Sequence, residues 1–164
     1  MIQSICSLTK PMLNLEEELR RVIEALEASG IPYAIAGGIA VSIYTTPRAT
    51  EDIDLLISAA DLNRALGTLQ VLGFQRGGPP MNVAQAQLRI QRLTKIAGSD
   101  LLPLDLLLAD SPPLEGILET RQRLDWVAQH LWVVSIEGLR VLKRLRGSPQ
   151  DLADLDALGP EGRE

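Results

Sequence analysis

The sequence holds very few of the residues from which many catalytic and binding sites are built. Its 164 residues include one cysteine, Cys6, and one histidine, His130, and only 3% are aromatic. A single thiol, which we read as incidental, excludes an internal disulfide and a cysteine cluster with metal-ligand spacing. A single histidine disfavours Ser/His/Asp and Cys/His nucleophilic catalysis, and so few rings disfavour a stacking platform for single-stranded nucleic acid. We therefore expect any catalysis to depend on carboxylates, cations or a bound metal.

Excess positive charge and long apolar runs are also missing. The 16 Lys and Arg residues are outnumbered by 21 Asp and Glu residues, so the formal net charge is -5. This balance argues against broad wrapping of duplex DNA, although it leaves room for a local basic patch. The apolar run 101–109 is too short and interrupted to cross a bilayer, and the N-terminus lacks the order of a secretory signal. We expect a cytoplasmic protein without a membrane partner.

Hydrophobic periodicity predicts a small sheet with helices before, between and after its strands. Helices are predicted at 15–29, 38–44, 59–72, 113–129, 136–146 and 149–158. Strands are predicted at 33–37, 53–57, 88–96 and 101–109, with a short extended segment at 131–135. The pattern is α/β or α+β with a small mixed sheet. We expect a single domain, 1–164, with a core at about 15–110 and a helical C-terminal part at about 111–158.

Two smaller features qualify this pattern. The segment 76–87 carries a Gly-Gly-Pro-Pro core that cannot lie inside a helix, so it is predicted to be the longest irregular segment. An exposed connection is favoured there over a mobile lid. Pro103 lies near the start of a predicted strand, which indicates an edge or entry position.

Asp52 and Asp54 stand out because they flank a single isoleucine at an otherwise apolar strand. Strand residues two apart point to the same face, so the two carboxylates are expected to project together. Carboxylates held this close repel each other unless a cation lies between them. Mg²⁺, or Mn²⁺ in its place, is the natural candidate because it takes carboxylate oxygens together with phosphates and water.

Asp105 is a third acid, and it is the only charged residue in the strand 101–109. An ionised carboxylate in a buried strand is costly without a partner. If this strand lies beside the Asp52 and Asp54 strand, the three acids converge on a site for one or two metal ions.

Gly37 and Gly38 are predicted to end a strand and open a helix. Such a junction lets the backbone approach a ligand and directs free N–H groups at an anion such as a triphosphate. Ser42, Thr45 and Thr46 could add hydroxyl donors, although Ser42 also reads as an ordinary helix residue. A Gly-Gly pair alone is most often a tight turn, and Asp-x-Asp alone is most often a polar strand end. The prediction therefore depends on the combination.

This combination resembles the nucleotidyltransferase-fold superfamily, which includes DNA polymerase beta, aminoglycoside nucleotidyltransferases and many small bacterial toxin or antitoxin proteins. Its signature is an apolar residue, Gly-Gly or Gly-Ser, a spacer, an Asp-hydrophobic-Asp or Glu motif, and a later third acid. Gly37 and Gly38, thirteen intervening residues at 39–51, Asp52 and Asp54, then Asp105 match this order. The resemblance covers about 15–158.

The stretch GGIAVSIYTTPRATEDIDLLI looks most like compact bacterial members related to abortive-infection toxins. Those carry a late helix with a lysine and then an Arg- and Asp-rich segment, which Lys143, Arg146, Asp151 and Asp154 resemble. The resemblance implies that Lys143 contacts a nucleotide phosphate, with Asp151 or Asp154 orienting it or a neighbouring arginine. Cations near a helix C-terminus are stabilised in any case. Arg48 could reach a phosphate or remain a solvated loop residue.

The resemblance implies a Mg²⁺-dependent nucleotidyltransferase that moves a nucleoside monophosphate from an NTP to an acceptor hydroxyl of RNA, protein or a small molecule. In that hypothesis Gly37 and Gly38 hold the triphosphate, Asp52 and Asp54 bind metal, and Asp105 completes the metal site and helps to deprotonate the acceptor. The alternative is a non-catalytic nucleotide-binding module, such as a toxin–antitoxin partner, with a partner protein or a second copy of the chain. An orphan structural domain would leave Asp105 unexplained.

Overall fold

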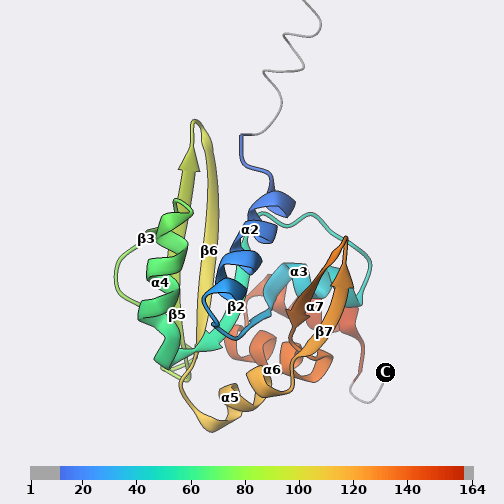
Figure 1. Cartoon of the computed structure of the whole chain (residues 1–164). Coiled ribbons are helices and arrows are strands. Elements are labelled where there is room, and N and C mark those ends of the chain that lie inside the picture. Colours follow the sequence, from blue (N-terminus) through green and yellow to red (C-terminus); the bar gives the residue numbers. More distant parts are fainter. Residues whose placement is uncertain (1–11, 161–164) are drawn as a thin grey trace, which may run out of the picture.

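A mixed sheet runs through the middle of the protein in this computed structural model, which describes residues 12–160 (Figure 1). Cys6 lies outside the described residues. The strands are β1 (Tyr33–Ile35), β2 (Ile53–Ser58), β3 (Gln75–Arg76), β4 (Met81–Val83), β5 (Leu88–Ala97), β6 (Asp100–Ala109), β7 (Gln122–Trp126) and β8 (Gln129–Val133). Their order in the sheet is β3-β5-β6-β2-β1-β8-β7, and β4 also pairs with β5. The mixed α/β architecture confirms the predicted fold class.

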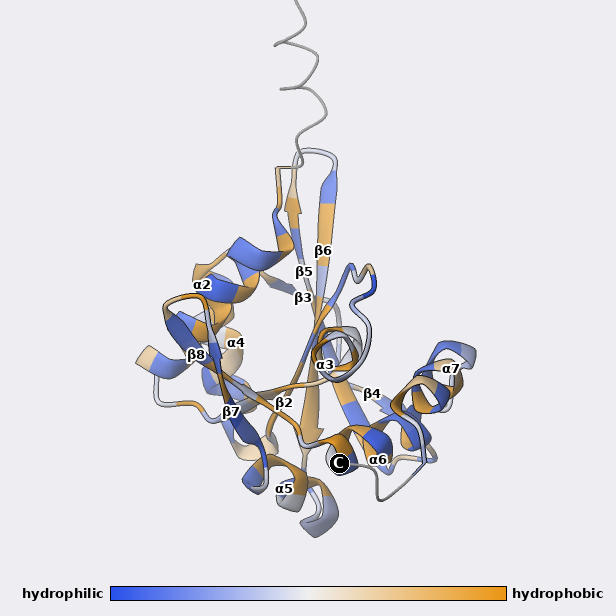
Figure 2. Ribbon diagram, turned by 90° about the vertical axis from the view of Figure 1, so that its right-hand side faces the viewer, coloured by the Kyte–Doolittle hydropathy of each residue, from blue (hydrophilic) through white to orange (hydrophobic). Residues whose placement is uncertain are grey.

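Helices cover the sheet on both faces. The α-helices of the described residues are α2 (Leu15–Ala28), α3 (Gly37–Tyr44), α4 (Leu62–Val71), α5 (Pro112–Glu119), α6 (Ile136–Arg146) and α7 (Pro149–Leu158), with a short 3₁₀ turn at Ala59–Asp61. In Figure 2, α2 and α4 lie on one side of the central strands, and α3, α6 and α7 lie on the other. None of the helices within 12–160 is long and apolar enough to cross a membrane.

The central strands β2 and β6 are apolar on both faces because each is covered by helices on both sides. Every residue from Ile53 to Ile57 is buried, as are the residues 104–109. The strands run parallel, with Asp54 beside Asp105 in the register. Burial of both faces explains why these strands read as continuous apolar runs in which each acid stands out.

The β5–β6 hairpin confirms the prediction for 88–109. Its register places Ile96 opposite Leu101 and continues without a break toward both strand ends. Pairing of β6 with β2 begins only at Leu104, so Pro103 precedes the stretch of β6 that has neighbours on both sides. Pro103 lies opposite Thr94 of β5 but has no partner on β2, which agrees with the predicted entry position.

The predicted helix at 113–129 is wrong beyond its first half. Helix α5 ends at Glu119, and the following residues form the β7–β8 hairpin, with Leu124 opposite Leu131. Strand β8 then adds to β1 in parallel, with Ile35 beside Val133. The part after 110 is therefore not purely helical. The apolar residues of β7 recur every second position, and pairing with β8 decides in favour of a strand.

The segment 76–87 is also more regular than predicted. Strand β4 pairs with β5, with Met81 opposite Ile90, and a turn at 84–87 then leads directly into β5. Ala84, Gln85 and Ala86 adopt positive φ angles in this turn. The segment therefore contains one short edge strand, but most of 76–87 is irregular and exposed, which agrees with the predicted exposed connection.

Candidate active site

The three predicted acids meet where β2 begins. Asp54 is the second residue of β2, and Asp105 is its neighbour on the parallel strand β6. Residues paired in this way project their side chains on the same face of the sheet. Asp52 lies directly before β2, and its charge acts on Asp54. The structure thus brings together acids that are about fifty residues apart in the sequence.

A cavity of about 400 Å³ opens beside Asp52 and Asp54, and Asp105 is not among the residues that line it. The cavity lies between the loop that leads into β2, the first turn of α3 and the junction of α6 with α7. Its lining residues are Gly38, Arg48, Ala49, Thr50, Glu51, Asp52, Asp54, Lys143, Arg146, Ser148, Gln150 and Asp151. Acids and cations thus face one hollow, which is the arrangement needed to bind a phosphate together with a metal ion.

Asp54 is the most strongly perturbed acid of the site. Burial raises its pKa from 3.8 to about 6, and the charges of Asp105 and Asp52 act in the same direction, while Arg146 and Lys143 oppose them. Its Oδ1 atom is buried, has no hydrogen-bond partner among the described residues, and lies 3.5 Å from Nη1 of Arg146. A carboxylate with an unsatisfied buried oxygen beside a cavity is a candidate ligand for a cation.

Asp105 is held by an arginine that the sequence analysis did not single out. Arg92 of β5 donates from Nε to Oδ1 and from Nη2 to Oδ2 of Asp105, both at 2.9 Å. The sequence contained a signal for this pair. Ala97 lies opposite Asp100 at the turn of the predicted hairpin, and counting back along both strands from there places Arg92 opposite Asp105. The buried carboxylate therefore has the partner that its burial requires.

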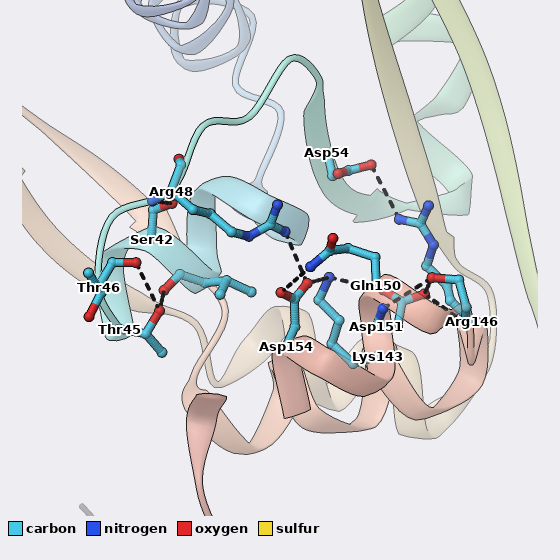
Figure 3. A network of polar contacts seen from close by, with 12 residues as sticks. Ser42, Thr45, Thr46, Arg48, Asp54, Lys143, Arg146, Gln150, Asp151 and Asp154 are labelled. Carbon is cyan, nitrogen blue, oxygen red and sulfur yellow. Dashed lines mark hydrogen bonds and ion pairs between the residues drawn. The ribbon is translucent and has the colours of Figure 1, made fainter. Parts of the chain in front are cut away.

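Lys143 lies in a cluster of buried charges that joins α6 to α7 (Figure 3). Its Nζ is 3.0 Å from Oδ1 of Asp151 and 2.8 Å from Oδ2 of Asp154, and its side chain is 6% exposed. Arg48 reaches the same Asp154 oxygen at 3.0 Å. Burial would raise the pKa of Asp151, but hydrogen bonds from Ser148 and Lys143 outweigh it and hold that pKa below its ordinary value. The acids thus orient Lys143 and Arg48 at the cavity.

Local sequence explains how α6 and α7 meet. Gly147 ends α6 in the left-handed conformation, and Ser148 caps α7 in a reciprocal capping box with Asp151. Pro149 occupies the first turn, where its missing N–H costs nothing. The predicted break at this point is confirmed, and Asp151 serves both the cap and the charge cluster.

The glycine pair lies at the start of α3, close to the acids. Gly37 has φ +61°, and a Cβ there would overlap the Asp54 carboxylate. A Cβ on Gly38 would lie 2.9 Å from Oγ1 of Thr50. The backbone of Asp54 also accepts a hydrogen bond from the N–H of Ala36 at 2.9 Å. The absence of side chains therefore lets the first turn of α3 approach the acids.

We expect Gly37→Ala to destabilise the protein by at least about 2 kcal/mol more than Gly30→Ala, because only the first adds a collision to left-handed strain. Gly30 is a matched control, with φ +67° and its nearest atom at 3.9 Å from an added Cβ. Urea denaturation followed by circular dichroism measures both changes. Equal losses in the two variants would show that Asp54 moves away freely and does not depend on Gly37.

The predicted hydroxyl donors do not contact the cavity. Ser42 Oγ accepts from the N–H of Arg48 at 3.3 Å and donates to its carbonyl at 3.4 Å, so it holds the loop in front of β2. Thr45 Oγ1 donates to the carbonyl of Val41 at 2.7 Å. Ser42 and Thr45 are not among the lining residues of the cavity, whereas Gly38, Arg48 and Lys143 are. Thr46 is not among them either.

The acids at the cavity could bind a cation, but they do not supply a complete set of protein ligands for it. Asp52 and Asp54 both line the cavity, and Oδ1 of Asp54 accepts no hydrogen bond from the described residues, whereas both oxygens of Asp105 accept hydrogen bonds from Arg92. No group of three or more His, Cys, Asp or Glu residues within 12–160 is placed to hold a metal ion. The structure therefore offers two acids, Asp52 and Asp54, to a divalent ion.

Comparison with known proteins finds similarity at the level of structure. No family model matches the sequence, and no curated protein matches it. The lincosamide antibiotic adenylyltransferase LnuA, solved with lincomycin bound, is 18% identical with a TM-score of 0.61, over 87% of this chain and 95% of LnuA. The antibiotic-resistance factor ANT(2″)-Ia is 15% identical with a TM-score of 0.53, over 90% of this chain and 75% of its own. As the Gly-Gly and Asp-Ile-Asp motifs predicted, the chain has the nucleotidyltransferase fold.

Proposed function

We propose that this protein transfers a nucleoside monophosphate from an NTP to an acceptor hydroxyl, with Mg²⁺ or Mn²⁺ as the metal. The observation that carries the proposal is the placement of Asp52 and Asp54 at a cavity that also exposes Gly38, Lys143 and Arg146. Acids for a metal ion and cations for phosphates are both needed for phosphoryl transfer, and here they face the same hollow.

In the proposed reaction the acceptor oxygen forms a bond to the α-phosphorus. The bond from that phosphorus to the oxygen bridging to the β-phosphate breaks, and pyrophosphate leaves with the electron pair. The acceptor proton passes to Asp54, because it lines the cavity whereas Arg92 occupies both oxygens of Asp105. A divalent ion held by Asp52 and Asp54 would supply stabilisation of the charge on the phosphate oxygens.

Backbone N–H groups and cationic side chains of this protein would orient the triphosphate. The first turn of α3 presents the Gly38 backbone to the cavity, where helix N-terminal N–H groups favour an anion. Lys143, Arg48 and Arg146 approach from the other walls. Their present partners are Asp151, Asp154 and Asp54, which keep the cations in place before a phosphate arrives.

A small-molecule hydroxyl is the acceptor class that we favour. LnuA was solved with lincomycin, and ANT(2″)-Ia with adenylyl-2″-tobramycin, so both of these structural neighbours are connected with antibiotics. RNA and protein hydroxyls are the other acceptors to be tested. A non-catalytic nucleotide-binding module is the second candidate function, because the Arg92 contacts already occupy Asp105.

The test uses α-labelled ATP, GTP, CTP and UTP with Mg²⁺ and a panel of lincosamides, aminoglycosides, RNA and the chain itself. We expect label transfer with release of pyrophosphate. The double variant Asp52→Asn/Asp54→Asn should lower the rate on the order of a thousandfold, since a bound metal contributes several kcal/mol. Asp61→Asn is the control, because Asp61 lies outside the cavity and pairs with Arg64.

Each outcome selects one function. NTP binding without transfer to any acceptor would favour the binding module over the enzyme. Failure of all four NTPs to bind in calorimetry, with the fold intact, would contradict both.

A further inference from the structure

Arg92 and Asp105 form a bidentate ion pair next to Asp54 of the candidate active site. The guanidinium donates from two nitrogens to the two oxygens of one carboxylate, each at 2.9 Å. Asp105 is 3% exposed, whereas Arg92 is 46% exposed and approaches from the neighbouring strand β5. A bidentate pair of this kind fixes the orientation of the carboxylate as well as neutralising its charge.

The same hairpin contains a second pair that shows what an ordinary contact looks like. Arg89 lies three residues earlier on β5 and donates from Nε to Oδ2 of Asp110 at 2.8 Å, with side chains 39% and 32% exposed. That pair makes a single contact in solvent, where ion pairs contribute little. The Arg92 pair differs because it controls a buried carboxylate directly beside Asp54.

Asp54, unlike Asp105, has a carboxylate oxygen without a hydrogen-bond partner within the described residues. It neighbours Asp105 in the sheet, and the oxygen concerned is its Oδ1. The nearest cation that pairs with it, Arg146, is 3.5 Å away. Two adjacent acids on one face thus differ: both oxygens of Asp105 accept hydrogen bonds from a guanidinium, whereas Oδ1 of Asp54 has only the longer ion pair with Arg146.

We propose that Arg92 is a positioning residue that keeps Asp105 out of metal coordination, so that a divalent ion is bound by Asp52 and Asp54 alone. The inference rests on the proposed function, because it concerns the metal of that reaction. Asp105 then acts on the ion only through its position beside Asp54, and Arg92 sets how many carboxylates the ion can recruit.

A double variant that leaves the net charge of the site unchanged tests this inference. Arg92 and Asp105 are together neutral, and so are Gln and Asn in the double variant Arg92→Gln/Asp105→Asn. If Asp105 is withheld from the ion, removing both partners changes neither the ligands nor the local charge. If Asp105 is a ligand, the same double variant loses one carboxylate from the metal shell.

The measurement is Mn²⁺ binding to the full chain without nucleotide, followed by electron paramagnetic resonance of the free ion and by calorimetry. We expect the double variant to match the unmodified protein within about twofold. Arg92→Gln alone frees the Asp105 carboxylate, and we expect it to bind Mn²⁺ about tenfold more tightly, because affinity rises with the number of charged ligands. Arg89→Gln, the matched control, should leave binding unchanged, and Asp52→Asn/Asp54→Asn should abolish it.

A loss of tenfold or more in the double variant would overturn the inference, since it would make Asp105 a ligand. Unchanged binding in Arg92→Gln, with circular dichroism showing an intact fold, would overturn it as well. If neither the unmodified protein nor Arg92→Gln binds Mn²⁺, both the inference and the metal dependence of the proposed reaction fail. If the unmodified protein binds and only the Arg92 predictions fail, the proposed reaction stands.

Discussion

Replacing Asp54 by asparagine is expected to raise the free energy of unfolding by about 3 kcal/mol at pH 7.5, while it removes the proposed nucleotidyl transfer. The pKa of Asp54 rises from 3.8 to about 6 in the folded protein, chiefly because the carboxyl is buried and secondarily because Asp105 and Asp52 lie close. Each unit of such a shift corresponds to about 1.4 kcal/mol. The ionised side chain therefore destabilises the fold at neutral pH, and asparagine avoids that cost.

The direction of the pH dependence follows from the proton balance. Between pH 4 and 6 the folded state holds the Asp54 proton more tightly than the unfolded state, so the stability contributed by this group falls as pH rises through that range. Below about pH 4 the carboxyl is protonated in both states. The advantage of Asp54→Asn should therefore be small at pH 4 and reach its full value near pH 7.

Urea denaturation of both proteins at intervals from pH 4 to pH 8 measures this difference. Asp61→Asn serves as the control, because Asp61 lies in an exposed ion pair with Arg64. A stability difference that stays constant with pH, or that favours aspartate at pH 7.5, would contradict the prediction. Such a result would mean that Arg146 compensates the Asp54 charge fully.

Replacing Lys143 by methionine is expected to reduce the free energy of unfolding by about 3–5 kcal/mol, the usual cost of breaking a buried ion pair from one side. Lys143 is the shared partner of Asp151 and Asp154, whose side chains are 5% and 3% exposed. Without the ammonium group both carboxylates remain buried close to one another. Helix α7 should then separate from α6, and the cavity should lose one wall.

Two comparisons make this prediction specific. Arg89→Met removes a cation from the exposed pair with Asp110 and should cost less than about 1 kcal/mol. The triple variant Lys143→Met/Asp151→Asn/Asp154→Asn also removes the two buried carboxylates that lose Lys143, and it should recover at least half of the lost stability, although not the proposed nucleotide binding. Urea denaturation and hydrogen exchange of the α7 amides report these changes. Full stability of Lys143→Met would show that water solvates the two acids in its absence.

Much of the core was readable from the sequence because its elements are strongly patterned. The periodic helix α2, the β5–β6 hairpin and the break at Gly147 and Ser148 agree with prediction. Each of them has a local signal in the sequence: the spacing of apolar residues in α2, the short turn of the hairpin, and the capping residues at the break. The extended segment predicted at 131–135 overlaps β8, but β7 was missed because it is short and half exposed, so its alternation competes poorly with a helical pattern.

The candidate site also has a part that the sequence predicts and a part that it leaves open. The Gly-Gly and Asp-Ile-Asp motifs, with a lone Asp105 in an apolar strand, were sufficient to predict the nucleotidyltransferase fold and the acids that would meet. Those motifs depend only on strand alternation and on the cost of burying a charge. The roles of these residues in metal binding and catalysis stay predictions that the proposed experiments test.

Only the tertiary structure decided how most of the charges are paired. The docking of α7 brings Asp151 and Asp154 to Lys143, and the pairing of β2 with β6 places Asp54 beside Asp105, whereas the Arg92–Asp105 pair follows from the register of one hairpin. The sequence alone determined which residues carry charge into the buried interior. Partner choice depends on strand order and helix docking between distant segments, and on distances of about 3 Å that no local pattern encodes.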